Sequence, residues 1–157
     1  MSRPALVGVI SDTHGTLDPR ILEALADVEH IVHAGDVGGP EILAQLESVA
    51  PVTAVKGNTD GGILPWLDGQ ESIQIAGCTI RILHDLSDLA GRVPPGVHVV
   101  VSGHTHLPAV YERDGVWFVN PGSASRPRGR SRRSVALIEI AATGIGAPGI
   151  DVRIVEV

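Results

Sequence analysis

The feature of this 157-residue sequence that most constrains its fold is a repeated pairing of a short apolar run with a helical pattern that starts at proline. Residues 5–10 form an apolar run of strand length that leads directly into Ser11-Asp12-Thr13-His14-Gly15. Such runs are typical of strands covered on both faces. Pro19 then predicts a helix start, and the apolar positions that follow have helical spacing: Ile21, Leu22, Leu25 and Val28. The pattern indicates a βα unit with polar residues at its turn.

The unit occurs a second time, and a third strand follows it. Residues 30–34 predict a strand that ends at Gly35-Asp36, and Pro40 predicts the start of a second helix. Residues 51–55 predict a third strand, which ends at Lys56-Gly57-Asn58. Strands joined by helices pair in parallel through right-handed crossovers, so their carboxyl ends lie side by side. Open α/β sheets bind ligands at this edge, where we expect Asp12, His14, Asp36 and Asn58.

The remainder of the chain reads mainly as hairpins. Residues 71–75 and 78–83 alternate polar and apolar side chains around Ala76-Gly77, which predicts an antiparallel pair that ends at His84. A second hairpin is predicted around Asp114-Gly115. The other predicted elements are a short helix within residues 85–90 and strands at 97–101, 134–140 and 150–157.

The tetrapeptide Gly103-His104-Thr105-His106 directly follows the apolar run of residues 97–101. Because the two imidazoles lie beyond the end of this run, we expect a loop to present at least one of them. A lone His-x-His pair in a loop is more often solvated or hydrogen-bonded than metallated. The pair therefore carries weight only together with the other polar strand ends.

Composition limits the class of protein and the chemistry of any site. With 43% hydrophobic and 19% charged residues the chain is not disordered, and its length predicts a single domain over residues 1–157. Cys78 is the only cysteine, which excludes an internal disulfide and a multi-cysteine zinc site. Metal binding would rest on His, Asp and Asn, donors that suit manganese, iron, nickel or zinc. Because residues 1–6 lack a long apolar region and no apolar run is of membrane-spanning length, we expect a cytoplasmic protein without a membrane partner.

Positive charge is concentrated in one segment of an acidic chain. The formal net charge is −6, yet five of the twelve cationic residues lie close together: Arg126, Arg128, Arg130, Arg132 and Arg133. We favour a solvated loop for this segment, and the alternative is a surface that gathers polyanionic substrates. The net charge argues against a general nucleic-acid binder, although the segment keeps a nucleic-acid partner open. No stripe identifies an interface, so homo-oligomerisation also stays open.

Five ordered motifs resemble those of the calcineurin-like metallophosphoesterases. They are Asp12-x-His14, Gly35-Asp36, Gly57-Asn58-x-Asp60, His84 and Gly103-His104-x-His106. Asn120-Pro121-Gly122-Ser123 further resembles the small single-domain branch that includes YfcE-type phosphodiesterases and the Vps29 subunit of retromer. The resemblance covers essentially the whole chain, and it implies a four-layer α/β/β/α sandwich with mixed sheets and a dinuclear metal site at the strand ends.

The resemblance also implies a role for each motif residue. Asp12, His14 and His106 would hold one metal ion, Asn58, His84 and His104 would hold the other, and Asp36 would bridge them. We expect catalytic roles for Asp36, Asn58 and His104. Side chains separated by one residue can diverge around a turn, so His104 and His106 would serve different ions, with Gly103 allowing the backbone to bend. We leave His30, His33 and His98 out of the site as satisfied core or surface histidines.

The implied activity is hydrolysis of a small phosphoester, preferentially a diester, by a hydroxide that bridges two divalent ions and attacks phosphorus in line. Manganese is the preferred ion, with nickel, iron and zinc as alternatives. Two residues depart from the family pattern: Thr59 replaces a histidine that acts near the leaving group, and Asp85 replaces a glycine. A hydroxyl is a far weaker acid, so the leaving-group proton must come from water, another residue or the metals. The alternative function is a Vps29-like, non-catalytic scaffold that binds proteins and retains a vestigial metal pocket.

Overall fold

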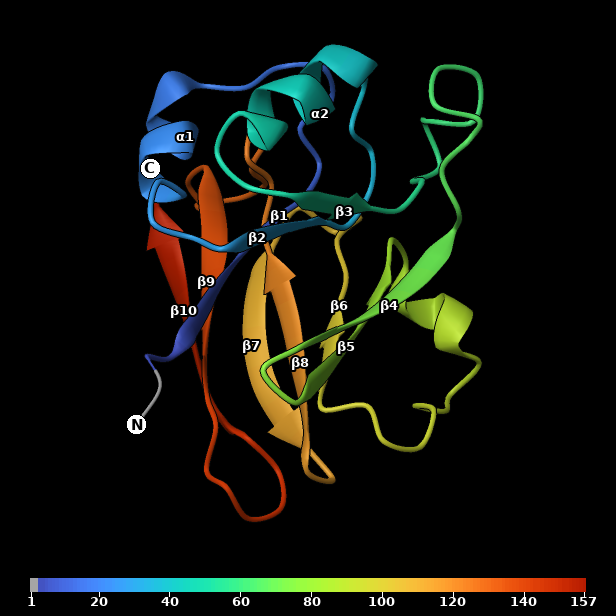
Figure 1. Cartoon of the computed structure of the whole chain (residues 1–157). Helices are drawn as coiled ribbons and strands as arrows, with labels where there is room; N and C mark the ends of the chain where they lie inside the picture. The colour runs from blue at the N-terminus through green and yellow to red at the C-terminus, as the bar shows by residue number, and fades with distance from the viewer. Residues whose placement is uncertain (1–2) are drawn as a thin grey trace.

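The computed structural model describes residues 3–157, which form two five-stranded sheets and a few short helices (Figure 1). In chain order the strands are β1 (Ala5–Ile10), β2 (His30–His33), β3 (Val52–Ala54), β4 (Gln70–Ile75), β5 (Cys78–Leu83), β6 (Val99–Val101), β7 (Pro108–Arg113), β8 (Val116–Pro121), β9 (Ser134–Ala141) and β10 (Gly149–Glu156). The helices are α1 (Pro19–Ala24) and α2 (Pro40–Glu47), and a 3₁₀ turn, η1, spans Leu86–Leu89.

The first sheet has the strand order β10-β9-β1-β2-β3. Strands β1, β2 and β3 pair in parallel, as the two βα units predict, and β9 and β10 extend the sheet in antiparallel fashion. Asp18 caps α1 by accepting a hydrogen bond from the Arg20 backbone N–H at 2.9 Å, and Pro19 occupies the first helical turn. The predicted order of strand, polar turn and helix is therefore confirmed.

The second sheet has the strand order β4-β5-β6-β8-β7. Both predicted hairpins are present as the antiparallel pairs β4/β5 and β7/β8. Strands β5, β6 and β8 are parallel to one another. The segment with η1 connects the end of β5 to the start of β6, and β7 runs back between the end of β6 and the start of β8. The carboxyl ends of these three strands therefore also lie side by side.

Apolar side chains fill three layers of the molecule. The inner faces of the two sheets enclose buried residues such as Val9, Ile82 and Val101. Helices α1 and α2 pack on the outer face of the first sheet through Ile21 and Leu46, while η1 and its neighbouring loop cover the outer face of the second sheet. The predicted sandwich with mixed sheets is confirmed, and its fourth layer is reduced to the single turn η1 and its loop.

Six parallel strand ends, three from each sheet, provide the frame for the polar residues described below. Asp12 and His14 follow β1, Asp36 follows β2 and Asn58 follows β3. His84 follows β5, whereas His104 and His106 follow β6. Within residues 3–157, no helix has the length and apolar character that crossing a membrane requires.

Candidate metal centre

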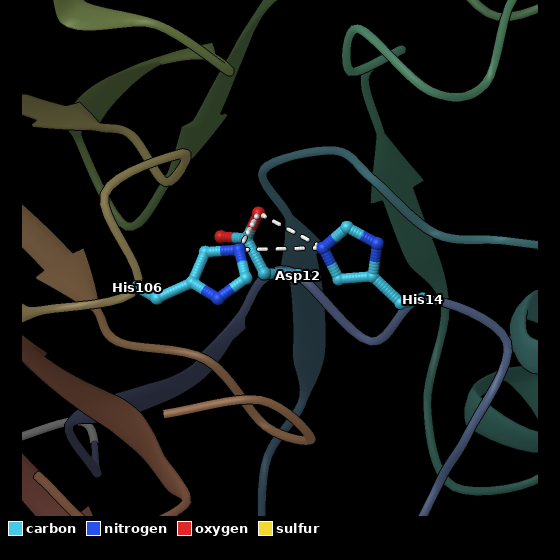
Figure 2. Close-up of side chains that lie close together, drawn as sticks. All are labelled: Asp12, His14 and His106. Atoms are coloured by element: carbon cyan, nitrogen blue, oxygen red, sulfur yellow. Dashed lines mark hydrogen bonds and ion pairs between the residues drawn. The ribbon is translucent and has the colours of Figure 1, made fainter. Parts of the chain in front are cut away.

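Asp12, His14 and His106 point toward one another from different sheets, as Figure 2 shows. The Nε2 atom of His106 lies 3.4 Å from Asp12 Oδ1 and 3.3 Å from His14 Nε2. His14 Nε2 is 3.8 Å from Asp12 Oδ1. Ligand atoms about 2.1 Å from a shared ion lie about 3.0–3.4 Å apart, so this triangle is close to the size that one divalent ion needs.

A second group contains Asp12, Asp36 and His84. His84 Nε2 lies 3.3 Å from Asp36 Oδ2 and 3.9 Å from Asp12 Oδ1. Asp36 Oδ2 is also 3.7 Å from His14 Nε2. Both carboxylates, and not Asp36 alone, therefore lie between His14 and His84.

Two buried atoms in these groups have no hydrogen-bond partner among the described residues, namely Asp12 Oδ1 and His84 Nε2. A buried polar atom without a partner costs about 1–3 kcal/mol, and such atoms are rare in folded proteins. The second oxygen of Asp12 is satisfied, because it accepts hydrogen bonds from Ser11 Oγ and the His104 backbone N–H. The unpartnered atoms thus face the shared centre, and the residues present fit divalent metal ions there.

The inner histidines are held with Nε2 toward this centre. His84 Nδ1 donates to the Ala34 carbonyl at 2.8 Å, and His106 Nδ1 donates to the Arg126 carbonyl at 2.6 Å. A carbonyl oxygen only accepts, so each ring keeps its proton on Nδ1 and its lone pair on Nε2. This arrangement is characteristic of metal-ligating histidines.

His104 and Asn58 are more exposed than the inner groups. The His104 ring lies 5.1 Å from that of His84, and the His14 and His106 rings are 5.2 Å apart, so the two histidines of the tetrapeptide diverge into separate pairs. His104 Nε2 is 3.8 Å from Asp85 Oδ2. These residues border an open hollow of about 420 Å³, lined by His14, Asp36, Asn58, Thr59, His104, His106, Arg126 and Arg128.

Five of the expected ligands adopt left-handed backbone conformations. Their φ angles are 55° at Asp12, 48° at His14, 54° at Asp36, 73° at His104 and 63° at His106. Non-glycine residues held in this region cost energy, and they cluster at functional sites where surrounding structure enforces them. Backbone hydrogen bonds supply that support, for example Asp12 N–H to Gly35 O at 3.0 Å and His14 N–H to Asp36 O at 2.9 Å.

The expectation that Gly103 provides the bend is wrong. Its φ lies outside the left-handed region, and His104 and His106 make the turn themselves. A Cβ atom at Gly103 would overlap Ser11 Oγ and would lie 2.7 Å from Asp12 Oδ2. Glycine is needed there because the end of β6 lies directly against the end of β1.

Thr59 and Asp60 hold the loops that carry the ligands. Thr59 donates its backbone N–H and its hydroxyl to Asp36 Oδ1, at 2.9 and 2.8 Å. The fully buried Asp60 carboxylate accepts backbone N–H bonds from Val37, Gly38 and Gly57. The family motif includes Asp60, but sequence reasoning assigned it no role, because two of its three backbone partners, Val37 and Gly38, are more than 20 residues away in the chain.

The segment Asn120-Pro121-Gly122-Ser123, at the end of β8, hydrogen-bonds to the loops that carry Asp12 and His104. Ser123 Oγ donates to the Asp12 carbonyl at 2.7 Å. Asn120 Nδ2 donates to the Gly103 carbonyl and to Thr105 Oγ1, both at 3.0 Å. The sequence indicated this motif but not its contacts, because the bonded residues are up to 111 positions apart in the chain.

Charge and burial act in opposite directions on the titratable groups. Burial alone would raise the pKa of Asp36, but the nearby His84 imidazole and the hydrogen bonds from Thr59 hold it well below its ordinary value. Burial alone would lower the pKa of His84, but the nearby Asp36 and Asp12 carboxylates and the hydrogen bond to the Ala34 carbonyl raise it. Burial lowers the pKa of His14 despite Asp36 and Asp12. A cation bound at Nε2 would compete only with the second proton of a doubly protonated His84 ring.

His33 is a satisfied core histidine, as expected. Its Nδ1 atom accepts from Gly35 N–H at 3.1 Å, so Nε2 carries the proton and donates to Thr13 Oγ1 at 3.0 Å. The Thr13 hydroxyl in turn donates to the Val37 carbonyl at 2.7 Å. Complete burial lowers the pKa of His33 to about 4. His33 therefore joins the first two ligand loops from behind and is not itself a ligand.

Comparisons with known proteins agree with this geometry. A calcineurin-like phosphoesterase superfamily domain matches residues 6–143. A probable metallophosphoesterase of Methanothermobacter thermautotrophicus is 34% identical over 142 residues, which cover 78% of this chain and 79% of the relative. Phosphodiesterase YfcE of Escherichia coli is 30% identical over an alignment of 160 residues, which covers 82% of this chain and 84% of the relative.

A solved structure of Vacuolar Protein Sorting 29 from Cryptosporidium parvum aligns over 99% of this chain and 100% of that chain, with a TM-score of 0.74. At 21% identity this likeness shows the fold alone. The family model and the curated relatives, together with the clustered Asp and His residues, also show the class of chemistry, which is metal-dependent hydrolysis of phosphoester bonds. The chain belongs to the calcineurin-like phosphoesterase superfamily.

Proposed function

We propose that this metallophosphoesterase acts on phosphodiesters and uses two divalent ions held at the ends of five strands, β1, β2, β3, β5 and β6. The observation that carries the proposal is the convergence of Asp12 Oδ1, Asp36 Oδ2 and inward-facing histidine Nε2 atoms, two of them without a hydrogen-bond partner. The name of the 30% identical Escherichia coli relative, a phosphodiesterase, supports a diester substrate.

We assign Asp12, His14 and His106 to one ion, Asn58, His84 and His104 to the other, and Asp36 to a position between them. The two ring pairs, His14 with His106 and His84 with His104, support this division. Asp12 Oδ1 lies 3.4 Å from His106 Nε2 and 3.9 Å from His84 Nε2, so Asp12 would be within reach of both histidine pairs. Bound divalent ions supply Lewis acidity, which polarises the phosphoryl group and activates water.

The charge of the proposed donor set suits an anionic substrate. Only two carboxylates, Asp12 and Asp36, belong to the proposed donor set, and Asn58 is neutral, so two divalent ions would leave the centre net positive. Thr59 directs its hydroxyl hydrogen to Asp36, which keeps the carboxylate oriented. Because that hydrogen is already donated, we do not assign the leaving-group proton to Thr59.

We propose manganese as the first ion to test, followed by nickel, iron and zinc. Every donor in the proposed set is nitrogen or oxygen, which suits these ions. The single thiol, Cys78, is buried in the core between the sheets, where burial raises its pKa to about 11. A cytoplasmic location and a single domain over residues 1–157 stay predictions.

The decisive experiment measures hydrolysis of bis(p-nitrophenyl) phosphate and p-nitrophenyl phosphate by chelator-treated protein, with each ion restored in turn. We expect turnover to require an added ion and to be faster for the diester. Asp36→Asn should lower kcat/KM by at least about 100-fold. Asp151→Asn, an exposed matched control on β10, should leave it unchanged.

Faster hydrolysis of the monoester would contradict the diester assignment. Equal activity of Asp36→Asn and the parent would contradict the assigned centre. Absence of bound metal and of turnover, with an obligate protein partner, would instead support the Vps29-like scaffold. That alternative is not favoured here, because all seven expected ligand positions carry side chains able to bind metal.

A further inference from the structure

Two arginines border the hollow of the metal centre and take no part in the proposed ligand set. Arg126 and Arg128 line the hollow together with His14 and His106, and both arginine side chains are exposed. They belong to the cationic segment of residues 126–133, which sequence reasoning favoured as a solvated loop. The segment is largely exposed in the structure, and its first two arginines also lie beside the site.

The backbone of Arg126 is part of the centre. Its N–H donates to Ser123 Oγ at 2.8 Å, and its carbonyl accepts from His106 Nδ1 at 2.6 Å. Ser123 Oγ donates in turn to the Asp12 carbonyl. One peptide group of Arg126 is bonded to the expected ligand His106, and the other to Ser123, which holds the Asp12 loop. The backbone of Arg126 is therefore fixed beside the site, and the exposed residue lines the hollow.

The charges of these two arginines are not neutralised within the described chain. Arg133, in the same segment, forms an ion pair with Asp18 at 2.9 Å. For Arg126 and Arg128, residues 3–157 contain no ion pair. Two uncompensated guanidinium groups at one rim attract an anion, and their planar donors match phosphate oxygens.

We propose that Arg126 and Arg128 form an anion subsite that binds a phosphate group of the substrate other than the one being cleaved. The inference rests on the proposed function, since the cleaved group is assigned to the centre itself. Asp36 and His106 are buried where they line the hollow, whereas Arg126 and Arg128 line it as exposed residues. A group bound between the arginines therefore lies outside the reacting position, which makes the substrate class a diester with an additional terminal phosphate.

The test compares two compounds that share one leaving group. They are thymidine 3′-(p-nitrophenyl phosphate) and the same compound carrying a 5′-phosphate. With metal-loaded protein we expect kcat/KM to be about tenfold higher for the phosphorylated compound. The double variant Arg126→Gln/Arg128→Gln should reduce this ratio to near one. The matched control Arg130→Gln/Arg132→Gln removes the same charge from exposed positions outside the hollow and should keep the parent's ratio.

Three kinetic outcomes would overturn the subsite. They are the absence of a preference in the parent, an equal loss on both compounds in Arg126→Gln/Arg128→Gln, and an equal reduction of the ratio by the control pair. The second outcome would assign the arginines to the cleaved phosphate, and the third would indicate only general attraction by the segment.

Equilibrium binding separates the subsite from the proposed function. Calorimetric titration of chelator-treated protein with thymidine 3′,5′-bisphosphate and thymidine 3′-phosphate should show tighter binding of the bisphosphate. Arg126→Gln/Arg128→Gln should abolish the difference. If neither ester is hydrolysed with any ion while this difference persists, the proposed function fails and the subsite stands. Equal binding of both ligands would overturn the subsite whatever the activity.

Discussion

At the scale of single residues, the centre depends on side chains that are not ligands but hydrogen-bond to the expected ligands or to the loops that carry them. His33 connects the loop of Asp12 to the loop of Asp36 through Thr13 and Gly35. Thr59 directs two hydrogen bonds to one oxygen of Asp36. Such supporting contacts orient ligand atoms and typically change metal affinity by about 10–100-fold when they are removed.

Burial of His33 predicts a loss of stability in mild acid. Its pKa is about 4 in the folded protein against an ordinary 6.5, so between these values the unfolded chain takes up a proton that the folded protein does not. Stability from this group is complete above pH 6.5 and is lost as the pH falls toward 4, by about 3 kcal/mol. Urea unfolding of metal-free protein at pH 7.0 and about pH 4.5 measures the difference. His33→Gln should be less stable at pH 7 but should show a smaller pH dependence, and an unchanged dependence would contradict the explanation.

The hydroxyl of Thr59 predicts a selective effect on metal affinity. Thr59→Val keeps the shape and the backbone N–H bond to Asp36 but removes the side-chain donor. We expect metal binding to weaken by about tenfold in a calorimetric titration. Thr59→Ser retains the donor and serves as the matched control. If the valine and serine variants bind metal equally well, the hydroxyl does not orient Asp36.

At the scale of elements, the site forms where strand ends from two sheets are brought into close contact. The end of β6 lies against the end of β1, and only glycine fits at position 103. The His104 N–H then donates to Asp12 Oδ2 at 3.0 Å, which joins the two strand ends directly. The second hairpin adds Ser123, whose hydroxyl bonds to the Asp12 carbonyl.

This close contact predicts that Gly103→Ala is strongly destabilising. The added methyl group would overlap Ser11 Oγ and force β1 and β6 apart, at a cost of about 1–3 kcal/mol. For a chain of this size that corresponds to a Tm lower by several degrees, which thermal unfolding measures. Gly61→Ala is the matched control, because nothing lies within 4 Å of a Cβ at that position. Equal Tm values for the two variants would show that the strand ends can separate freely.

At the scale of the whole molecule, the expected ligands tie together the two halves of the sandwich. Asp12, His14, Asp36 and Asn58 belong to the first sheet, whereas His84, His104 and His106 belong to the second. An ion bound by both sets stabilises the folded chain through binding that the unfolded chain cannot reproduce.

Metal addition is therefore expected to raise the thermal stability of the protein. At about 100 times the dissociation constant, one ion adds about 2.7 kcal/mol, which should raise Tm by several degrees. Thermal unfolding with manganese and with chelator gives the difference. Asp12→Asn should lose most of the rise, whereas the exposed Asp151→Asn should retain it. A rise of the same size in both variants would place the bound ion elsewhere.

The sequence by itself determined the strands, the hairpins, the parallel order β1-β2-β3 and the set of side chains at the strand ends. Those features follow from local periodicity, from proline and glycine positions, and from motifs that each occupy a few consecutive residues. Asp12, Asp36 and His84 could be named because each lies at the end of a predicted strand and occupies a position of a recognised family motif.

Only the tertiary structure decided how those side chains share the centre. It showed that Asp12 contacts both groups of histidines, that Gly103 is required for close packing instead of bending, and that Arg126 and Arg128 lie at the rim. It also made β5, β6 and β8 parallel neighbours. These features depend on contacts between residues far apart in the chain, whose distances arise from the packing of one sheet on the other and leave no local periodic signal.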